Sequence, residues 1–226
     1  DSSVVAIGAL TAGTLKVQSG GDAQSLFAEI GAGRTGTATV SGVGSTWTVT
    51  NSLDVGASST GTLDIMAGAR VTVSSDTFIG AGSGVSGTVN ISGSQARLIT
   101  GPVLSIGEFG NGSLSISGGG SVTSPAGSDN RIGNQSSSSG TVTMSNGFWP
   151  IGGSLTVGNF GSANLQINAN STVLVGGDLF IAKTAFSTAS VSLTGDGAQL
   201  EDSGAGGIYV GGGTSAAGGN GMLNIG

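Results

Sequence analysis

The sequence predicts an all-β fold, a parallel β-solenoid of about nine coils of about 25 residues each. Three observations support this fold: a composition suited to short strands and tight turns, a five-residue strand motif that recurs along the chain, and a second motif with the same period. Two independent markers that share one period indicate a structural repeat.

The composition favours strands and turns over helix or disorder. Glycine supplies 46 of 226 residues, proline only 3, and charged residues make up 8% of the chain. Glu, Lys, Arg and Gln, which favour helices, are scarce, whereas Ser, Thr, Val and Ile are abundant. A disordered chain combines high charge with low hydrophobicity, but here 37% of residues are hydrophobic and the mean hydropathy is +0.28.

The first motif reads Gly-Thr/Ser, apolar, polar, apolar, as in Gly61-Thr62-Leu63-Asp64-Ile65. Alternation of apolar and polar residues is typical of a half-buried strand. A last copy ends at Ile225. In the earlier copies the final apolar residue recurs every 23 to 28 residues, at Val17, Val40, Ile65, Ile91, Ile116, Met144, Ile167 and Leu193.

The second motif reads apolar, polar, Val/Ile, and is followed by Gly in every copy but one, where Ala182 follows Ile181. Glycine at fixed places turns the chain at the same corners in each repeat. Stacked coils then pair each strand with its equivalents in the coils before and after it. The copies end at Ile7, Ile30, Val55, Ile79, Ile106, Ile132, Val157, Ile181 and Val210.

A finer pattern predicts two alternating coil types, with a true unit of roughly 50 residues. An apolar residue follows the first motif's last residue by seven positions in some coils and by six in the others. The seven-position residues are Trp47, Leu98, Ile151 and Leu200, and the six-position residues are Val71, Val122 and Val173. A meander, sandwich or propeller is the alternative fold, but a propeller blade needs about 40 residues.

Charge and residue types exclude several functions. The 12 acidic and 6 basic residues form no basic stripe, so nucleic acid is not an expected partner. The sequence has no amphipathic or polybasic membrane anchor, so we expect no direct membrane insertion. The absence of His and Cys removes Ser-His-Asp and Cys-His catalysis. We predict no cofactor and no enzyme activity.

Carboxylates are the remaining candidates for catalysis or metal binding. Polysaccharide-cleaving β-helix enzymes use paired carboxylates, or Ca²⁺ with Arg or Lys. Residues one repeat apart become neighbours in a solenoid, so Asp54 and Asp76 are a candidate pair. Further candidates are Asp129 with Arg131, the adjacent pair Glu201-Asp202, and for calcium Asp22, Asp196 and Glu201-Asp202. We interpret all of them as solvated surface charges, and we predict no catalytic or metal site.

Aromatic residues supply the one predicted surface contact. Phe148 and Trp149 precede a proline at a corner, and we expect one ring to point outward and contact a sugar or a protein. Trp47 is interpreted as a core residue. Phe109 and Phe160 follow the second motif and either pack over the corner or extend a surface strip.

Thr-x-Thr segments raise a further possibility, which is ice binding by a flat face. Thr37-Ala38-Thr39 and Thr141-Val142-Thr143 fit this pattern, whereas Asp64 and Ser115 interrupt the row. We therefore do not favour ice binding.

A family resemblance follows from these repeats. The segments Gly42-Val43-Gly44-Ser45-Thr46-Trp47, Ser52-Leu53-Asp54-Val55-Gly56 and Gly61-Thr62-Leu63-Asp64-Ile65 resemble passenger repeats of bacterial autotransporters, and the resemblance spans nearly the whole chain. It implies a right-handed, single-stranded parallel β-helix displayed at the outer membrane of a Gram-negative bacterium. Residues 1–226 are then one solenoid domain, a fragment of a longer passenger. No residue-level functional motif matches, so no site is transferred.

These observations predict a cell-surface adhesin or self-association passenger that acts in adhesion, autoaggregation or biofilm formation through a polar face. The expected partners are the protein itself, rod against rod, or a host or cell-surface protein or glycan. Avidity over many weak contacts would give the strength. The alternatives are a polysaccharide-active β-helix enzyme and a structural stalk that presents another domain.

Overall fold

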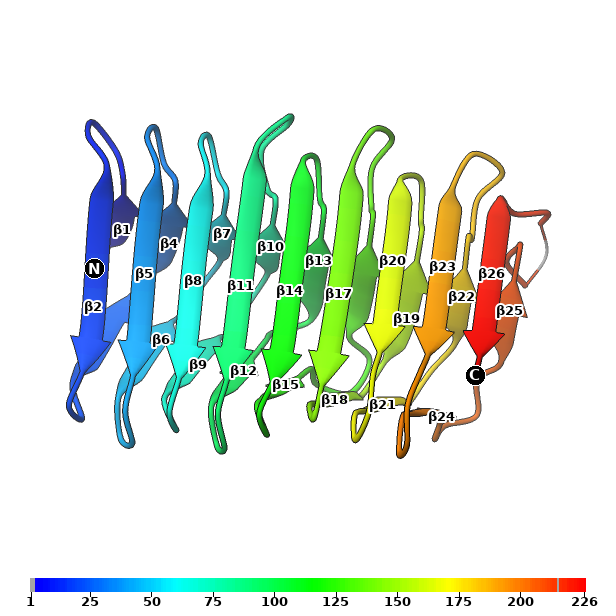
Figure 1. The fold of residues 1–226 in the computed structure, drawn as a ribbon. Helices are drawn as coiled ribbons and strands as arrows, with labels where there is room; N and C mark the ends of the chain where they lie inside the picture. Colours follow the sequence, from blue (N-terminus) through cyan, green and yellow to red (C-terminus); the bar gives the residue numbers. More distant parts are fainter. Residues whose placement is uncertain (1–2, 215) are drawn as a thin grey trace.

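The protein is a β-solenoid in the computed structural model, which describes residues 3–214 and 216–226. Three parallel sheets run along the rod, and each turn of the chain adds one strand to each sheet (Figure 1). The chain runs down a front strand, returns at the back and reaches the next front strand one coil further along, which makes the coil right-handed (Figure 1). The predicted domain, 1–226, includes residues 1, 2 and 215, which lie outside the described residues.

The strands alternate between the sheets in the order A, B, C along the chain. Sheet A contains β1 (Val4–Ile7), β4 (Phe27–Ile30), β7 (Leu53–Val55), β10 (Thr77–Ile79), β13 (Val103–Ile106), β16 (Asp129–Ile132), β19 (Ser154–Val157), β22 (Leu179–Ile181) and β25 (Ile208–Val210). Sheet B contains β2 (Gly13–Gln18), β5 (Gly36–Ser41), β8 (Gly61–Met66), β11 (Ser86–Ser92), β14 (Asn111–Ser117), β17 (Ser139–Ser145), β20 (Ser162–Ile167), β23 (Thr188–Leu193) and β26 (Asn220–Ile225). Sheet C contains β3 (Asp22–Ser25), β6 (Thr46–Val49), β9 (Arg70–Val73), β12 (Arg97–Ile99), β15 (Ser121–Thr123), β18 (Phe148–Ile151), β21 (Thr172–Val175) and β24 (Gln199–Asp202).

Both sequence motifs are confirmed as strands in matching register. The first motif forms sheet B, where Val40 pairs with Ile65 and Ile65 with Ile91. The second motif forms sheet A, where Ile7 pairs with Ile30 and Ile30 with Val55. Because sheets A and B have nine strands and sheet C has eight, the described chain makes about eight full turns.

The core is a continuous set of apolar columns that the three sheets enclose. The inward residues alternate with outward polar residues along each strand, as β5 and β8 show with the order buried, half-buried, buried. Trp47 and Trp149 are the largest fully buried side chains, and the indole N–H of Trp47 donates a hydrogen bond to Ser25 Oγ at 3.3 Å. Burial of these columns is the main stabilising contribution.

The corners between sheets A and B require a left-handed backbone. Gly31, which follows Ile30, has φ +81°, and a Cβ at this position would lie 2.2 Å from the carbonyl oxygen of Ser59 in the next coil. The equivalent Ala182 takes the same conformation with φ 56°. The glycine after the second motif therefore provides both the turn and the close approach of stacked coils.

The column predicted for one core residue, Ile151, is wrong, because the register of sheet C differs at one coil. Trp149, not Ile151, pairs with Val173 and continues the inward column that contains Trp47. The corner before β18 is shorter than the alternation of coil types requires, so this coil belongs to neither type. Ile151 is also buried, but it pairs with Val175 in the next inward column.

None of the described residues forms a helix of the length and hydrophobicity needed to cross a bilayer.

Candidate functional site

The outer face of sheet B carries a row of small hydroxyl side chains in strand register. This Thr row stands outward of the core because its members alternate with inward-facing residues, as Thr62 does between the buried Gly61 and Leu63. Six successive strands contribute Thr or Ser to it. Its members are Thr14, Thr37, Thr62, Thr88, Ser113, Thr141, Asn164, Ser190 and Met222.

A second row runs beside the Thr row, two residues further along each strand. It holds Thr at only two positions, Thr39 and Thr143, so the two rows do not make the regular Thr-x-Thr array that ice binding needs. Its members are Lys16, Thr39, Asp64, Asn90, Ser115, Thr143, Gln166, Ser192 and Asn224.

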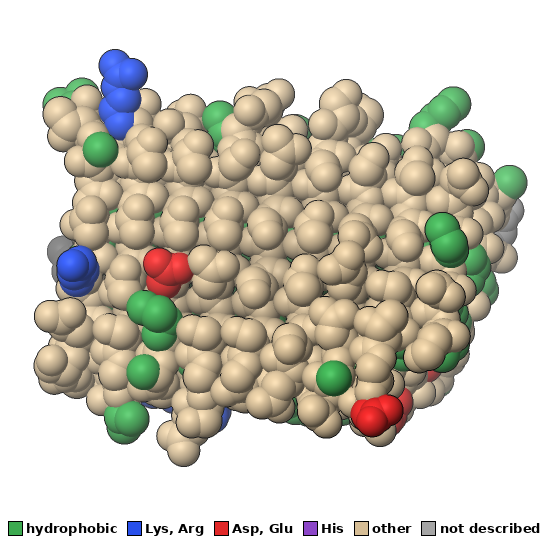
Figure 2. Space-filling model, in the orientation of Figure 1, with side chains coloured by type: hydrophobic (Ala, Val, Ile, Leu, Met, Phe, Trp, Pro, Cys, Tyr) green, Lys and Arg blue, Asp and Glu red, His purple; other side chains and the backbone are tan. Residues whose placement is uncertain are grey.

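The two rows are almost free of charge, although the chain has a net charge of −6. Lys16 and Asp64 are their charged members, and these two cancel. The Asp64 carboxylate accepts a hydrogen bond from Asn90 Nδ2 at 2.8 Å in the next coil. In Figure 2, which shows this side of the molecule, red and blue side chains are accordingly sparse. The outer face of sheet B is therefore polar but nearly neutral.

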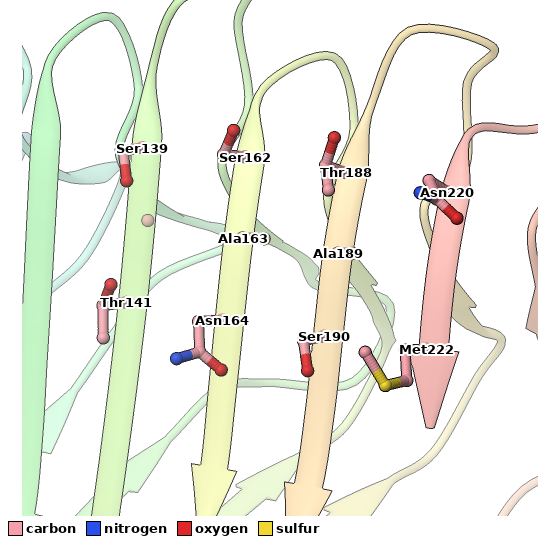
Figure 3. Close-up of a pocket in the computed structure, with 11 residues that line it drawn as sticks. Ser139, Thr141, Ser162, Ala163, Asn164, Thr188, Ala189, Ser190, Asn220 and Met222 are labelled. Carbon is pink, nitrogen blue, oxygen red and sulfur yellow. The ribbon is translucent and has the colours of Figure 1, made fainter. Parts of the chain in front are cut away.

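A shallow hollow of about 240 Å³ lies at the C-terminal half of this face. Figure 3 shows Thr141, Asn164, Ser190 and Met222 of the Thr row on one side of it. The opposite side is formed by the residues that begin the same strands, Ser139, Ser162, Thr188 and Asn220 (Figure 3). Its floor is backbone, with the small residues Gly140, Ala163 and Ala189 between the two sides. The hollow offers hydroxyl and amide groups and no titratable group.

Sheet A brings the predicted pair Asp54 and Asp76 onto adjacent coils, and adds Glu29, which pairs in register with Asp54. Burial, together with the negative charges of Glu29 and Asp76, raises the pKa of Asp54 to about 6. Asp54 Oδ1 is buried and accepts no hydrogen bond from the described residues. This carboxyl group consequently retains its proton at a higher pH than an ordinary aspartate.

The other predicted carboxylates are more exposed or have partners. Arg131 forms an ion pair with Asp129 in the same strand. Asp22 accepts hydrogen bonds from Thr46 and Gln24, and Asp202 accepts one from the backbone of Gly204. In the part of the chain that the structure describes, no group of three or more His, Cys, Asp or Glu residues is arranged to hold a metal ion.

Of the two predicted contact residues, Phe148 and Trp149, one ring points outward, as expected. Phe148 is 43% exposed on the outer face of sheet C, whereas Trp149 is fully buried and its indole N–H has no hydrogen-bond partner among the described residues. Trp149 therefore cannot contact a surface ligand, because alternation along β18 points it into the core. Phe109 and Phe160 are about half exposed, at 51% and 48%.

Sequence reasoning missed a buried polar ladder across three coils. Asn134 donates a hydrogen bond to Glu108 Oε2 at 2.7 Å, and Asn159 donates one to Asn134 Oδ1 at 2.8 Å. Each of the three residues directly follows a corner glycine of sheet A. This shared position in the repeat could have indicated the ladder from the sequence. The ladder compensates the burial of Glu108, which is only 8% exposed.

The chain matches no family model, no curated protein and no solved structure.

Proposed function

We propose that the protein is a surface adhesin that associates with further copies of itself through the outer face of sheet B. The observation that supports this is the near-neutral polar face on a chain of net charge −6. Like-charged molecules repel, so contact between two copies costs least where charge is absent. The resemblance to autotransporter passengers supports the same function and a place at the cell surface.

The size of the face suits an interface between two rods. Nine strands at ~4.8 Å spacing, each about six residues long at ~3.3 Å per residue, cover on the order of 800 Å². A standard protein interface buries about 800 Å² on each partner. Each hydroxyl or amide contact contributes about 1 kcal/mol or less, so binding strength would come from many contacts and many copies.

The test introduces charge into the Thr row. The triple variant Thr37→Glu, Thr88→Glu and Thr141→Glu places one carboxylate on every second strand of this part of the face, on β5, β11 and β17. Self-association by the wild-type chain, measured by analytical ultracentrifugation and by clustering of protein-coated beads, should be lost in this variant. At high salt part of the association should return, because salt screens exposed charges.

The matched control puts the same three changes on sheet C, at Thr48, Thr72 and Thr123, whose side chains also point outward. It should associate as the wild type does. Equal loss in both triple variants would indicate a general charge effect and would refute the assignment to sheet B. A monomeric wild type at all concentrations would refute self-association itself.

A second candidate, a polysaccharide-active enzyme, is favoured by one observation, the raised pKa of Asp54 beside Glu29. A protonated carboxyl next to a carboxylate is the arrangement that glycoside hydrolysis uses. Release of reducing ends from acidic or neutral glycans by the wild type, and its loss in Asp54→Asn, would establish this function. No release from either class of glycan would exclude it for those substrates.

A further inference from the structure

Two arginines stand side by side on the outer face of sheet C, at the start of adjacent strands. Arg70 begins β9 and Arg97 begins β12, and the two residues pair in register. Both side chains are exposed. Because neighbouring strands lie about 4.8 Å apart, both guanidinium groups can reach one bound group.

Neither guanidinium forms an ion pair within 4.0 Å with a carboxylate of the described residues. Thr46 and Ser121 are the register neighbours on either side of the pair. Among the described residues the one ion pair within 4.0 Å is Arg131 with Asp129. Like charges directly opposite on paired strands are destabilising, so the pair of arginines is not explained by folding. It places two of the six basic residues of an acidic chain together.

The arginines line a surface hollow of about 310 Å³ at the corner between sheets B and C. The exposed side chain of Gln95 lines the hollow beside them and supplies amide donors. Gln95 has φ 65°, a left-handed conformation that is uncommon for a residue other than glycine. The volume reaches the lower end of the range for ligand pockets, roughly 300 to 1,000 Å³. It exceeds what a single small anion would fill, and it has room for a sugar ring that carries the anion.

We propose that this hollow binds a sugar that bears a sulfate or phosphate ester. Two guanidinium forks provide paired N–H donors that match the oxygens of a tetrahedral anion, and their charge complements its negative charge. The Gln95 amide lies beside them to hydrogen-bond the sugar hydroxyls. The site is independent of the proposed self-association, because its two arginines lie on sheet C and bind through charge, whereas the outer face of sheet B is nearly neutral.

The experiment titrates the intact chain by calorimetry with a sulfated disaccharide, the same disaccharide without sulfate, and inorganic sulfate. At low ionic strength the sulfated sugar should bind, the unsulfated sugar should not, and inorganic sulfate should bind more weakly. Affinity should fall steeply toward 1 M salt, where the screening length is about 3 Å. A phosphorylated sugar with the same backbone should bind comparably, since the tetrahedral anion is the shared chemistry.

Substitutions of the two arginines test whether they bind the anionic group. Arg70→Gln and Arg97→Gln should each lower the affinity by about tenfold or more, in line with the strength of a hydrogen bond to a charged group. The double variant Arg70→Lys and Arg97→Lys keeps both positive charges but loses the planar guanidinium groups. It should therefore bind the sulfated sugar several-fold more weakly than the wild type does. Arg34→Gln, which removes an equal charge from an exposed corner residue between sheets A and B, should bind within about twofold of the wild type.

Thermal unfolding separates loss of the site from loss of the fold. Removing either Arg70 or Arg97 relieves repulsion, so these variants should unfold at the wild-type temperature or slightly above it. The proposal is refuted if the double Gln variant binds the sulfated sugar as the wild type does, or if Arg34→Gln weakens binding equally. It is also refuted if the wild type does not bind at low salt, or binds inorganic sulfate but not the sulfated sugar.

Discussion

Glu29 and Asp54 are register partners on adjacent strands of sheet A, so two carboxylates lie one coil apart while Asp54 Oδ1 is buried without a hydrogen-bond donor among the described residues. This relationship makes the stability of the rod depend on pH. Burial and the repulsion from Glu29 and Asp76 raise the pKa of Asp54 from 3.8 to about 6. A raised pKa means that the folded state binds the proton more tightly than the unfolded state does.

The first prediction concerns this pH dependence. The contribution of Asp54 to the free energy of unfolding should be fully present below pH about 4 and lost as the pH rises through about 6. The shift corresponds to about 3 kcal/mol for a fully buried group, and partial exposure reduces this to about 1 to 2 kcal/mol. Urea unfolding at several pH values should show a wild-type loss of this size, and Asp54→Asn should remove it.

The control for the pH prediction is Asp196→Asn, which changes an exposed carboxylate at a corner. This variant should retain the wild-type dependence on pH. If Asp54→Asn also retains it, another group is responsible and the role given to Asp54 is wrong.

The second prediction concerns the polar ladder of Glu108, Asn134 and Asn159. Asn134→Ala removes both hydrogen bonds of the ladder and leaves the buried Glu108 carboxylate without its donor. We expect the free energy of unfolding to fall by about 2 to 3 kcal/mol, as measured by urea denaturation. Asn111→Ala, which alters an exposed side chain at the start of β14, should change it by less than about 0.5 kcal/mol.

The third prediction compares the two buried tryptophans. Replacement by Phe creates a similar loss of volume at Trp47 and at Trp149. At Trp47 it also deprives Ser25 Oγ of its hydrogen bond, whereas at Trp149 it removes an indole N–H that has no partner among the described residues. Trp47→Phe should therefore destabilise the fold by about 1 kcal/mol more than Trp149→Phe. Equal losses in urea denaturation would show that the two indole N–H groups have equivalent environments.

The fourth prediction separates backbone conformation from steric contact at glycine. Gly31 and Gly127 both have positive φ, but a Cβ at Gly127 would meet no atom within 4 Å, whereas one at Gly31 would clash with the backbone of the next coil. Gly127→Ala should lower the free energy of unfolding by about 1 to 2 kcal/mol, because alanine is unfavourable in the left-handed conformation. Gly31→Ala should lower the free energy of unfolding by clearly more than Gly127→Ala does. It should also lower the thermal unfolding temperature further. Equal costs would show that the coils separate locally to accept the methyl group.

The solenoid can be predicted from the sequence, because each coil repeats one local pattern and pairs with the coils next to it in the chain. Residues such as Val40 and Ile65 predict the columns of sheet B. The Ile30-Gly31 step predicts both a strand end of sheet A and the corner that follows. Alternation along five residues was sufficient to separate inward from outward side chains in these two sheets, because their corner glycines fix the register.

Which side chains become neighbours across coils of unequal corner length could be read only from the folded structure. A shorter corner placed Trp149 in the column of Trp47, where spacing predicted Ile151, and Phe148 is therefore the ring that points outward. The pairing of Arg70 with Arg97 depends on the same register. The raised pKa of Asp54 depends on burial and on charges from the coils on either side. A side chain's environment here is set by three coils at once, whereas a sequence motif describes one.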